Sequence, residues 1–274
     1  MEFDRIYAEV DLGRIEENMK AMKEHLRPGT KMYGVVKTDA YGHGAVPVAR
    51  TIDRFVCGYA VATVDEGLKL RRHGIEKEIL CLGPVSAGRY QECLENDISL
   101  PMFEYRRAKE LSDAAVAEGK TAKIHIAVDT GMSRIGLFPD EGSVETVKEI
   151  AELPALRIAG MFTHFARADE ADKTKAGEQY RRFHAFCDAV KAAGVEVPVC
   201  HCSNSAGIVE LPDFNMDAVR AGITIYGMYP SDEVKQDIIS LKPAMALKSF
   251  ITYIKEIEVS LSLNAITHRR NLGI

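Results

Sequence analysis

Residues able to do chemistry recur in this chain just after short apolar runs. They are Lys37, Tyr41, Arg134, His164, Asn204, Ser205, Arg220 and Gly222. An amine such as that of Lys37, when desolvated inside a cavity, has a lowered pKa and forms an imine with a carbonyl compound. A fixed guanidinium such as that of Arg134 could hold a phenolate or a carboxylate. What these groups do together depends on the elements that position them.

Each of these residues also has a structural explanation. A lysine after a strand, like Lys37, is usually a solvated surface residue. The segment Tyr41–Gly44 is typical of a tight turn, although its glycines would also let backbone amides approach a phosphate. Ser205 stands where a helix begins, so it is either an N-cap or part of a phosphate site at that N-terminus. His164 and Arg220 could be packing residues, and the alternative for Arg220 is a contact to a heteroaromatic nitrogen.

Two short motifs suggest other chemistry, and both are disfavoured. Asp129–Gly131 reads Asp-Thr-Gly, the signature of an aspartic protease, but that chemistry needs two carboxylates sharing a proton, normally in all-β lobes. Cys200–Cys202 reads Cys-His-Cys and suggests zinc, but its spacing differs from C-x2-C. A strand would also direct its two cysteines to the face opposite the histidine. We therefore expect no metal site.

Composition limits the classes of partner. The chain has 274 residues and a net charge of −5, so nothing in it attracts nucleic acid in general. Its N-terminal segment is charged and amphipathic, and no stretch approaches the roughly 20 apolar residues of a membrane span, so we expect a cytoplasmic protein without a membrane partner. Six scattered cysteines in a chain of this length indicate buried thiols and no disulfide framework.

Short apolar runs alternate with helix-patterned segments, which is the pattern of parallel βα units. Eight such runs predict a closed (β/α)8 TIM barrel, and an open doubly wound sheet is the alternative. In such a barrel the active site lies at the carboxyl ends of the strands, where the candidate residues fall. The runs are residues 31–38, 58–63, 78–83, 98–103, 122–129, 157–164, 197–204 and 217–227.

Two further strand-like segments lack a place in an eight-stranded barrel. One is residues 6–12, ahead of a helix predicted at 13–25, and the other continues to about Glu258. We expect them to be orphan strands of a truncated second domain. The predicted organisation is therefore a strand at 1–12, a barrel at 13–240, the start of a β domain at 241–258 and an atypical tail at 259–274.

Five motifs, in order, spacing and residue type, resemble the alanine racemase family. They read VVKTDAYGHG (35–44), VDTGMSRIG (128–136), FTHFARAD (162–169), HCSNSAG (201–207) and VRAGITIYG (219–227). The resemblance extends from about residue 5 to residue 258.

The resemblance implies a pyridoxal 5'-phosphate cofactor and a role for each candidate residue. Lys37 would hold the cofactor as a Schiff base and serve as one of two proton-transfer bases. Tyr41, Ser205 and the amides of Gly222 and Ile223 would bind its phosphate, with Asn204 as a near neighbour. The other three would contact the ring, namely Arg134 at the phenolic oxygen, His164 against the ring and Arg220 at the pyridine nitrogen.

The chain departs from the family pattern at two places. Many members carry a carbamylated lysine where this chain has Ala127, so we expect a bound anion such as chloride to balance Arg134. Members also continue into a mainly β domain that supplies the partner subunit's catalytic tyrosine. The last tyrosine here is Tyr253, which we expect within a strand.

The expected function is an isomerase that interconverts L- and D-alanine for cell-wall precursors, with low activity in a truncated chain. The alternatives are a racemase of serine or another small amino acid, and a non-enzymatic cofactor-homeostasis barrel. The family forms homodimers. For this chain we expect a monomer or weak dimer with exposed apolar surface around residues 6–12 and 248–258.

Overall fold

The structure is a computed structural model that describes residues 5–255, and its contacts divide the chain into two compact units. The larger unit comprises residues 10–245, and the smaller comprises, among the described residues, 5–9 with 246–255. Within residues 5–255, no helix has the combination of length and apolar character needed to cross a membrane.

The larger unit contains a closed barrel of eight strands in sequence order, with each neighbouring pair parallel, so the predicted TIM barrel is confirmed. Each of the eight predicted runs overlaps a strand, although β8 has only two residues and β7 begins one residue before its run. The strands are β2 (Lys31–Val35), β3 (Gly58–Val61), β4 (Glu78–Cys81), β5 (Ile98–Met102), β6 (Ala122–Ala127), β7 (Leu156–Phe162), β8 (Cys200–His201) and β9 (Ala218–Ala221).

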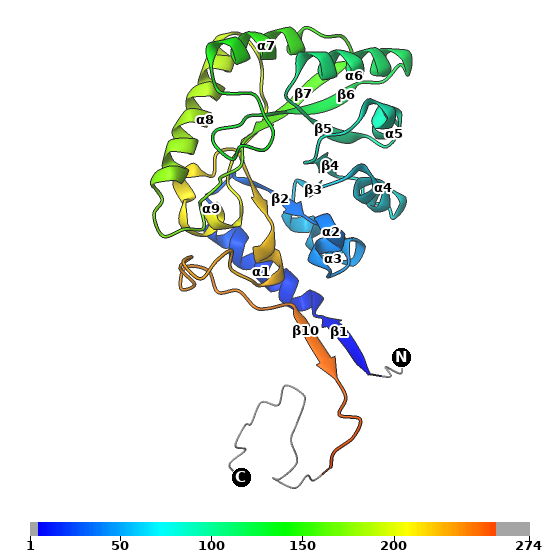
Figure 1. Cartoon of the computed structure of the whole chain (residues 1–274), viewed down its shortest axis with the longest axis vertical. Coiled ribbons are helices and arrows are strands. Elements are labelled where there is room, and N and C mark those ends of the chain that lie inside the picture. Colours follow the sequence, from blue (N-terminus) through cyan, green and yellow to red (C-terminus); the bar gives the residue numbers. More distant parts are fainter. Residues whose placement is uncertain (1–4, 256–274) are drawn as a thin grey trace, which may run out of the picture. The chain divides into compact units, whose positions relative to one another are not determined.

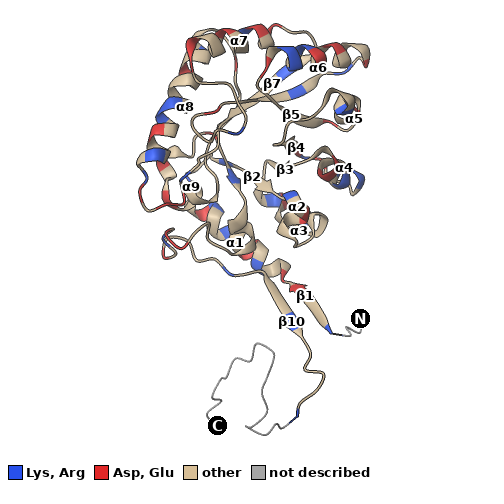
Figure 2. Ribbon diagram, in the orientation of Figure 1, with Lys and Arg blue, Asp and Glu red and all other residues tan. Residues whose placement is uncertain are grey.

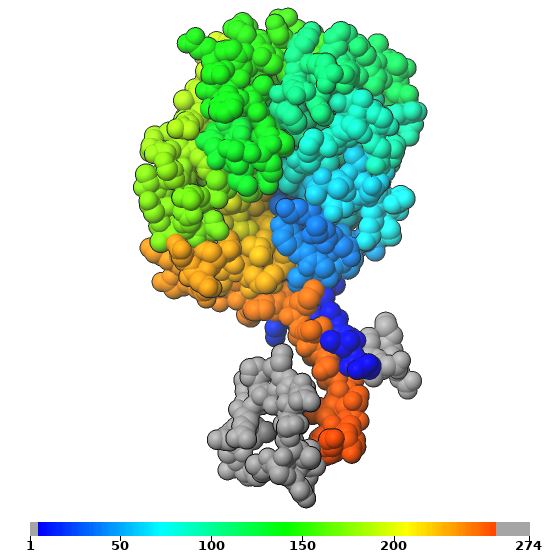
Figure 3. Space-filling model, viewed as in Figure 1, coloured from blue at the N-terminus to red at the C-terminus, as the bar shows by residue number. Residues whose placement is uncertain are grey.

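Helices surround these strands, and in Figure 3 the colours of the barrel follow one another in sequence order around it. Both signs of charge alternate along the outer helices in Figure 2, while their apolar stripes pack on the strands. The helices are α1 (Leu12–His25), α3 (Ala45–Ile52), α4 (Val64–Arg72), α5 (Tyr90–Glu95), α6 (Tyr105–Ala117), α7 (Glu141–Ala151), α8 (Thr174–Ala192) and α9 (Ser205–Glu210). Four 3-10 turns join them, η1 (Asp53–Phe55), η2 (Ala87–Arg89), η3 (Pro212–Phe214) and η4 (Ile223–Tyr226).

The segment α2 (Lys37–Tyr41) differs from every other helix because most of it is left-handed. Residues 38–41 have φ angles of +53°, +52°, +57° and +53°, and none of them is glycine. Each left-handed residue of this kind costs roughly 1–2 kcal/mol, so the surrounding contacts must hold the turn in place. The tight turn predicted at Tyr41–Gly44 therefore follows a longer left-handed segment, and Gly42, with a φ of +85°, ends that segment.

Outside the barrel, β1 (Ile6–Val10) and β10 (Met245–Ser249) form a two-stranded sheet. The two strands expected to lack partners therefore pair with each other. The expected strand up to Glu258 is too long, because β10 ends at Ser249, and Tyr253 lies beyond it in irregular backbone. The rest of that prediction, from residue 256 onward, lies outside the described residues.

Apolar side chains of this small sheet and the segment after it are exposed, as the sequence predicted. Ile6 is 59% exposed and Ile251 is 80% exposed. Two strands alone cannot bury an apolar face, so this surface is one on which a further element could pack.

Candidate active site

A cavity of about 660 Å³ lies at the carboxyl ends of the barrel strands. The structure brings all nine residues predicted from the sequence to its wall, although they come from five separate segments of the chain. They are Lys37, Tyr41, Arg134, His164, Asn204, Ser205, Arg220, Gly222 and Ile223. Parallel strands of a closed barrel all end at one rim, which is why residues so far apart in sequence meet here.

Lys37 follows β2 and is followed by the left-handed turn. Its Nζ lies 5.8 Å from the centroid of the Tyr41 ring, and its side chain is half-buried. The carboxylate of Glu66 accepts a 2.6 Å hydrogen bond from the backbone N–H of Thr38, and Asp39 accepts 2.7 and 2.9 Å bonds from Lys69 and from the N–H of Ala45. These contacts fix the backbone that carries the lysine.

A small polar cradle lies between Ser205, Gly222 and Tyr41. The N–H of Gly222 donates to Ser205 Oγ at 3.0 Å, and the hydroxyl of Thr224 donates to the same oxygen at 3.0 Å. A Cβ at Gly222 would stand 3.5 Å from both Ser205 Oγ and Tyr41 Oη, so the glycine keeps open a space between two hydroxyl groups. Such a space, lined by hydroxyls and an N–H, suits a phosphate.

Asn204, not Ser205, is the N-cap of α9. Its Oδ1 accepts a hydrogen bond from the N–H of Gly207 at 3.1 Å. The interpretation of Ser205 as a simple N-cap is therefore wrong, because the neighbouring residue performs that role. The hydroxyl of Ser205 is directed instead to Gly222 and Thr224.

Arg220 is 3% exposed and contacts no carboxylate among residues 5–255. Its Nη1 donates to His201 Nδ1 at 2.7 Å and to the His201 carbonyl at 3.1 Å. Its Nη2 donates to the carbonyls of Thr163 and Cys202 at 2.7 and 3.0 Å. All four η hydrogens thus have acceptors, and Nε–H is the remaining donor. Burial lowers the pKa of Arg220 to about 10, so it stays charged at neutral pH.

His164 is the neutral group among the cations of the cavity. Burial, and then the positive charges of Arg220, Arg134 and Lys37, lower its pKa to about 3. Its Nδ1 lies 3.3 Å from Nη2 of Arg220, so a proton on that nitrogen would face the N–H groups of the guanidinium. At neutral pH the wall of the cavity therefore carries three cationic side chains and one carboxylate, Asp169, which makes it suited to an anion.

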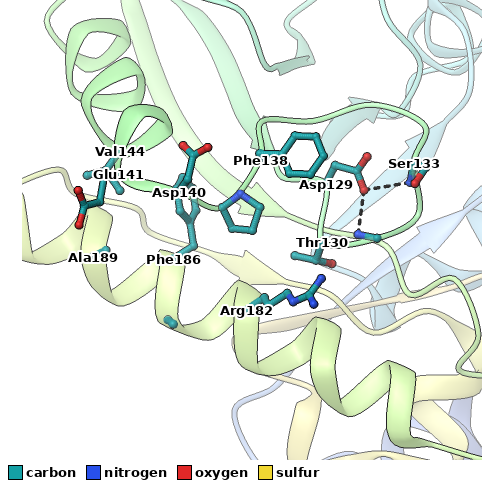
Figure 4. A pocket seen from close by; sticks show the side chains of 13 residues that line it. Asp129, Thr130, Ser133, Phe138, Asp140, Glu141, Val144, Arg182, Phe186 and Ala189 are labelled. Atoms are coloured by element: carbon teal, nitrogen blue, oxygen red, sulfur yellow. Dashed lines mark hydrogen bonds between the residues drawn. The ribbon is translucent and has the colours of Figure 1, made fainter.

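Arg134 lies on the loop after β6 and is exposed, without an ion pair among the described residues. The Asp-Thr-Gly segment shapes this loop, because Asp129 Oδ1 accepts from the N–H groups of Gly131 and Ser133 at 2.9 and 3.0 Å. Figure 4 shows these bonds beside a second cavity, of about 570 Å³, between the loop and helices α7 and α8. Asp129 is thus part of a loop-shaping turn, and Ala127, at the end of β6, is buried.

Several residues at this site were missed from the sequence. Asp169 and Phe162 line the cavity, and each stood within a quoted motif without being singled out. His201, considered only for zinc, is hydrogen-bonded to Arg220 and to His125. Within residues 5–255 no group of three or more metal-ligating side chains converges, and Cys202 Sγ donates to the carbonyl of Phe214.

Comparison with known proteins gives a consistent result. Residues 10–230 match the family described as "Alanine racemase, N-terminal domain". The alanine racemases of Clostridium novyi and Clostridium tetani are 45% and 40% identical over 253 and 254 residues, each alignment covering 92% of this chain. The structure of the alanine racemase of Clostridium difficile 630 in complex with cycloserine is similar with a TM-score of 0.91 at 39% identity, covering 93% of this chain and 71% of that one.

The likeness does not extend over the whole of those relatives. This chain spans 65% of the length of the Clostridium novyi and Clostridium tetani proteins.

Proposed function

This chain belongs to the alanine racemase family, and from that membership we propose that it is the cofactor-binding barrel of an enzyme that interconverts L- and D-alanine. One observation carries the proposal. Nine side chains and backbone groups expected to hold pyridoxal phosphate line a single cavity at the carboxyl end of the barrel. The supply of D-alanine for cell-wall precursors and a cytoplasmic location are part of the same proposal.

The residues present fit pyridoxal 5'-phosphate. The cradle of Ser205, Gly222 and Tyr41 would take the phosphate, and an alanine at position 222 would fill it. Nε–H of Arg220 would donate to the ring nitrogen, since its η hydrogens are already used. Lys37 would hold the aldehyde carbon covalently through its amine, and Arg134 would contact the phenolic oxygen. When bound, the cofactor supplies an electron sink that acidifies the α-proton of the amino acid.

Three residues of the chain would then transfer the proton, control the charge at the ring nitrogen and pack against the ring. Nζ of Lys37 would move a proton to or from the α-carbon on the side of the substrate that it faces. The permanent charge of Arg220 beside the ring nitrogen would resist protonation of that nitrogen, which limits the sink and disfavours side reactions. His164, neutral at the pH of function, would pack against the ring without adding charge.

A racemase needs a proton-transfer group on each face of its substrate, and Lys37 serves only one. The resemblance assigns that second group to none of the titratable side chains lining the cavity, which besides the cations are His164, Tyr41 and Asp169. We therefore propose that the second group comes from the β domain that the family carries. A polypeptide of these 274 residues, assayed without that domain, should bind cofactor yet racemise about 10²–10⁴-fold less than one assayed with it, the usual contribution of one acid or base.

The test is covalent trapping. The chain is incubated with pyridoxal phosphate, reduced with borohydride and digested, and we expect the cofactor mass on the peptide that contains Lys37. Lys37→Ala should lose the adduct, whereas the control Lys20→Ala, on the exposed face of α1, should keep it. An unmodified Lys37 peptide would contradict the cofactor assignment.

Two further measurements test the rest of the proposal. D-alanine formation at the full rate of a complete racemase would contradict the need for a second group outside this barrel. For the oligomeric state we expect a monomer or a weak dimer by light scattering at micromolar concentration.

A further inference from the structure

A chain of polar side chains crosses the interior of the barrel, where TIM barrels are usually filled by branched apolar residues. From Arg220 it passes to His201, then to His125 at 3.1 Å between ring nitrogens, and then to Glu78 Oε1 at 3.1 Å. Both histidines are fully buried. Glu78 is the first residue of β4, at the amino ends of the strands. This series of hydrogen-bonded side chains therefore connects the wall of the cavity to the opposite end of the barrel.

Donors and acceptors along this chain fit in only one order. A guanidinium only donates, so His201 Nδ1 must accept from Arg220. The proton of a neutral His201 then sits on Nε2 and points to His125 Nδ1, which must accept. The proton of His125 is thereby placed on Nε2, from which it is donated to the carboxylate of Glu78. Every bond is directed from the cation to the carboxylate.

The other assignments produce a clash. If His125 were doubly protonated, its Nδ1–H would donate to His201 Nε2, and the remaining proton of His201 would face the N–H of Arg220. Two donors would then meet at 2.7 Å inside the barrel. The direction of the pKa of His201 agrees, because burial and the charge of Arg220 lower it well below its ordinary value.

Glu78 is equipped to remain an anion at this position. Burial alone would raise its pKa, but hydrogen bonds from His125, Tyr33 and Ser99 oppose that effect and hold the pKa below its usual range. Tyr33 Oη donates to Oε2 at 2.8 Å and Ser99 Oγ to Oε1 at 2.8 Å. The side chain is 23% exposed, so solvent also reaches the carboxylate.

We propose that Glu78 is a positioning residue for Arg220, which acts through His125 and His201 as the counter-charge that this buried guanidinium otherwise lacks. The inference rests on the proposed function, in which Nε–H of Arg220 contacts the ring nitrogen of the cofactor. A carboxylate beside that nitrogen would favour its protonation. By placing the carboxylate two imidazoles away, the barrel balances the charge of Arg220 and keeps it a donor.

The first test needs no cofactor. The full chain is labelled with ¹⁵N-histidine, and long-range ¹H–¹⁵N correlation spectra report which ring nitrogen carries the proton. We expect Nε2–H for both His125 and His201 at neutral pH. A proton on Nδ1 of either ring, or a doubly protonated His125, would overturn the proposal.

The second test removes the charge and keeps the shape. In Glu78→Gln the amide oxygen still accepts from His125, so both tautomers should persist, but the Nε2-bound protons should shift upfield because a neutral acceptor bonds more weakly. This shift must reach His201, which does not contact Glu78. A shift confined to His125 would show that the imidazoles do not relay the charge, and would refute the proposal.

Tyr33→Phe is the matched control. It removes a hydrogen bond to Glu78 but keeps the negative charge of that carboxylate, and it keeps the aromatic ring whose centroid lies 5.3 Å from that of His201. It should leave the His201 signals in place, and a shift there equal to that of Glu78→Gln would count against the relay.

In the cofactor-loaded chain, Glu78→Gln should also shift the ¹⁵N signal of a labelled cofactor ring. If the wild-type chain binds no cofactor, the proposed function fails, while the tautomers still decide the inference. If Glu78→Gln does not fold, the wild-type tautomers decide it alone.

Discussion

Replacing His164 should change how the stability of this protein depends on pH. An unfolded histidine has a pKa of about 6.5, whereas folding lowers that of His164 to about 3. Between these values the unfolded chain binds a proton that the folded chain does not, so stability falls as the pH drops below about 6.5. At pH 5 this loss amounts to about 2 kcal/mol, and any folded pKa below about 4 gives nearly the same figure.

The assay is urea unfolding of the cofactor-free chain at pH 7 and pH 5, for the wild type, His164→Gln and the control His184→Gln on the exposed face of α8. The free energy of unfolding of His164→Gln should fall by about 2 kcal/mol less than that of the wild type over this interval. His184→Gln should retain the wild-type dependence. Equal losses in the wild type and in His164→Gln would refute the reasoning that His164 is held neutral by burial and by its cationic neighbours.

Other substitutions test the cradle, the Arg134 loop and the lysine turn. Gly222→Ala should weaken pyridoxal phosphate binding about tenfold to a hundredfold, because its Cβ fills the cradle and disrupts a charge-assisted bond of roughly 1.5–3 kcal/mol. Gly88→Ala, with no atom within 4 Å of its Cβ, should bind normally, and equal affinities by fluorescence titration would contradict the cradle. Gly136→Ala should lower stability by about 1–3 kcal/mol or more, measured as the free energy of unfolding, because its φ is +131° and its Cβ would meet the backbone nitrogen of Asp129 at 2.4 Å. Glu66→Ala should cost about 1–2 kcal/mol of stability through the lost cap of α4 and should slow covalent trapping at Lys37 by freeing the N–H of Thr38, so an unchanged trapping rate would argue against its hold on the turn.

The sequence alone was enough for the barrel and for the nine candidate residues of the cavity wall. Strands and helices alternate with clear periodicity, and a closed parallel barrel places all strand ends at one rim, so residues such as Lys37 and Arg220 were predicted to meet. The apolar alternation was less informative about where the last strand ends. The strand expected to reach Glu258 ends at Ser249 within the described residues, because an apolar alternation does not reveal whether a neighbouring strand is present.

Tertiary structure decided the features that depend on contacts between distant residues. The left-handed turn at 38–41 has no sequence signature, since three ordinary residues and a tyrosine are held there by Glu66 and Lys69 from another helix. The chain from Arg220 to Glu78 links four strands, and the periodicity that predicts each strand does not specify which buried polar groups will meet across the barrel. The sequence therefore determined which residues reach the cavity, because strand order alone governs that, whereas the charge and protonation of those residues were settled only by the packing around them.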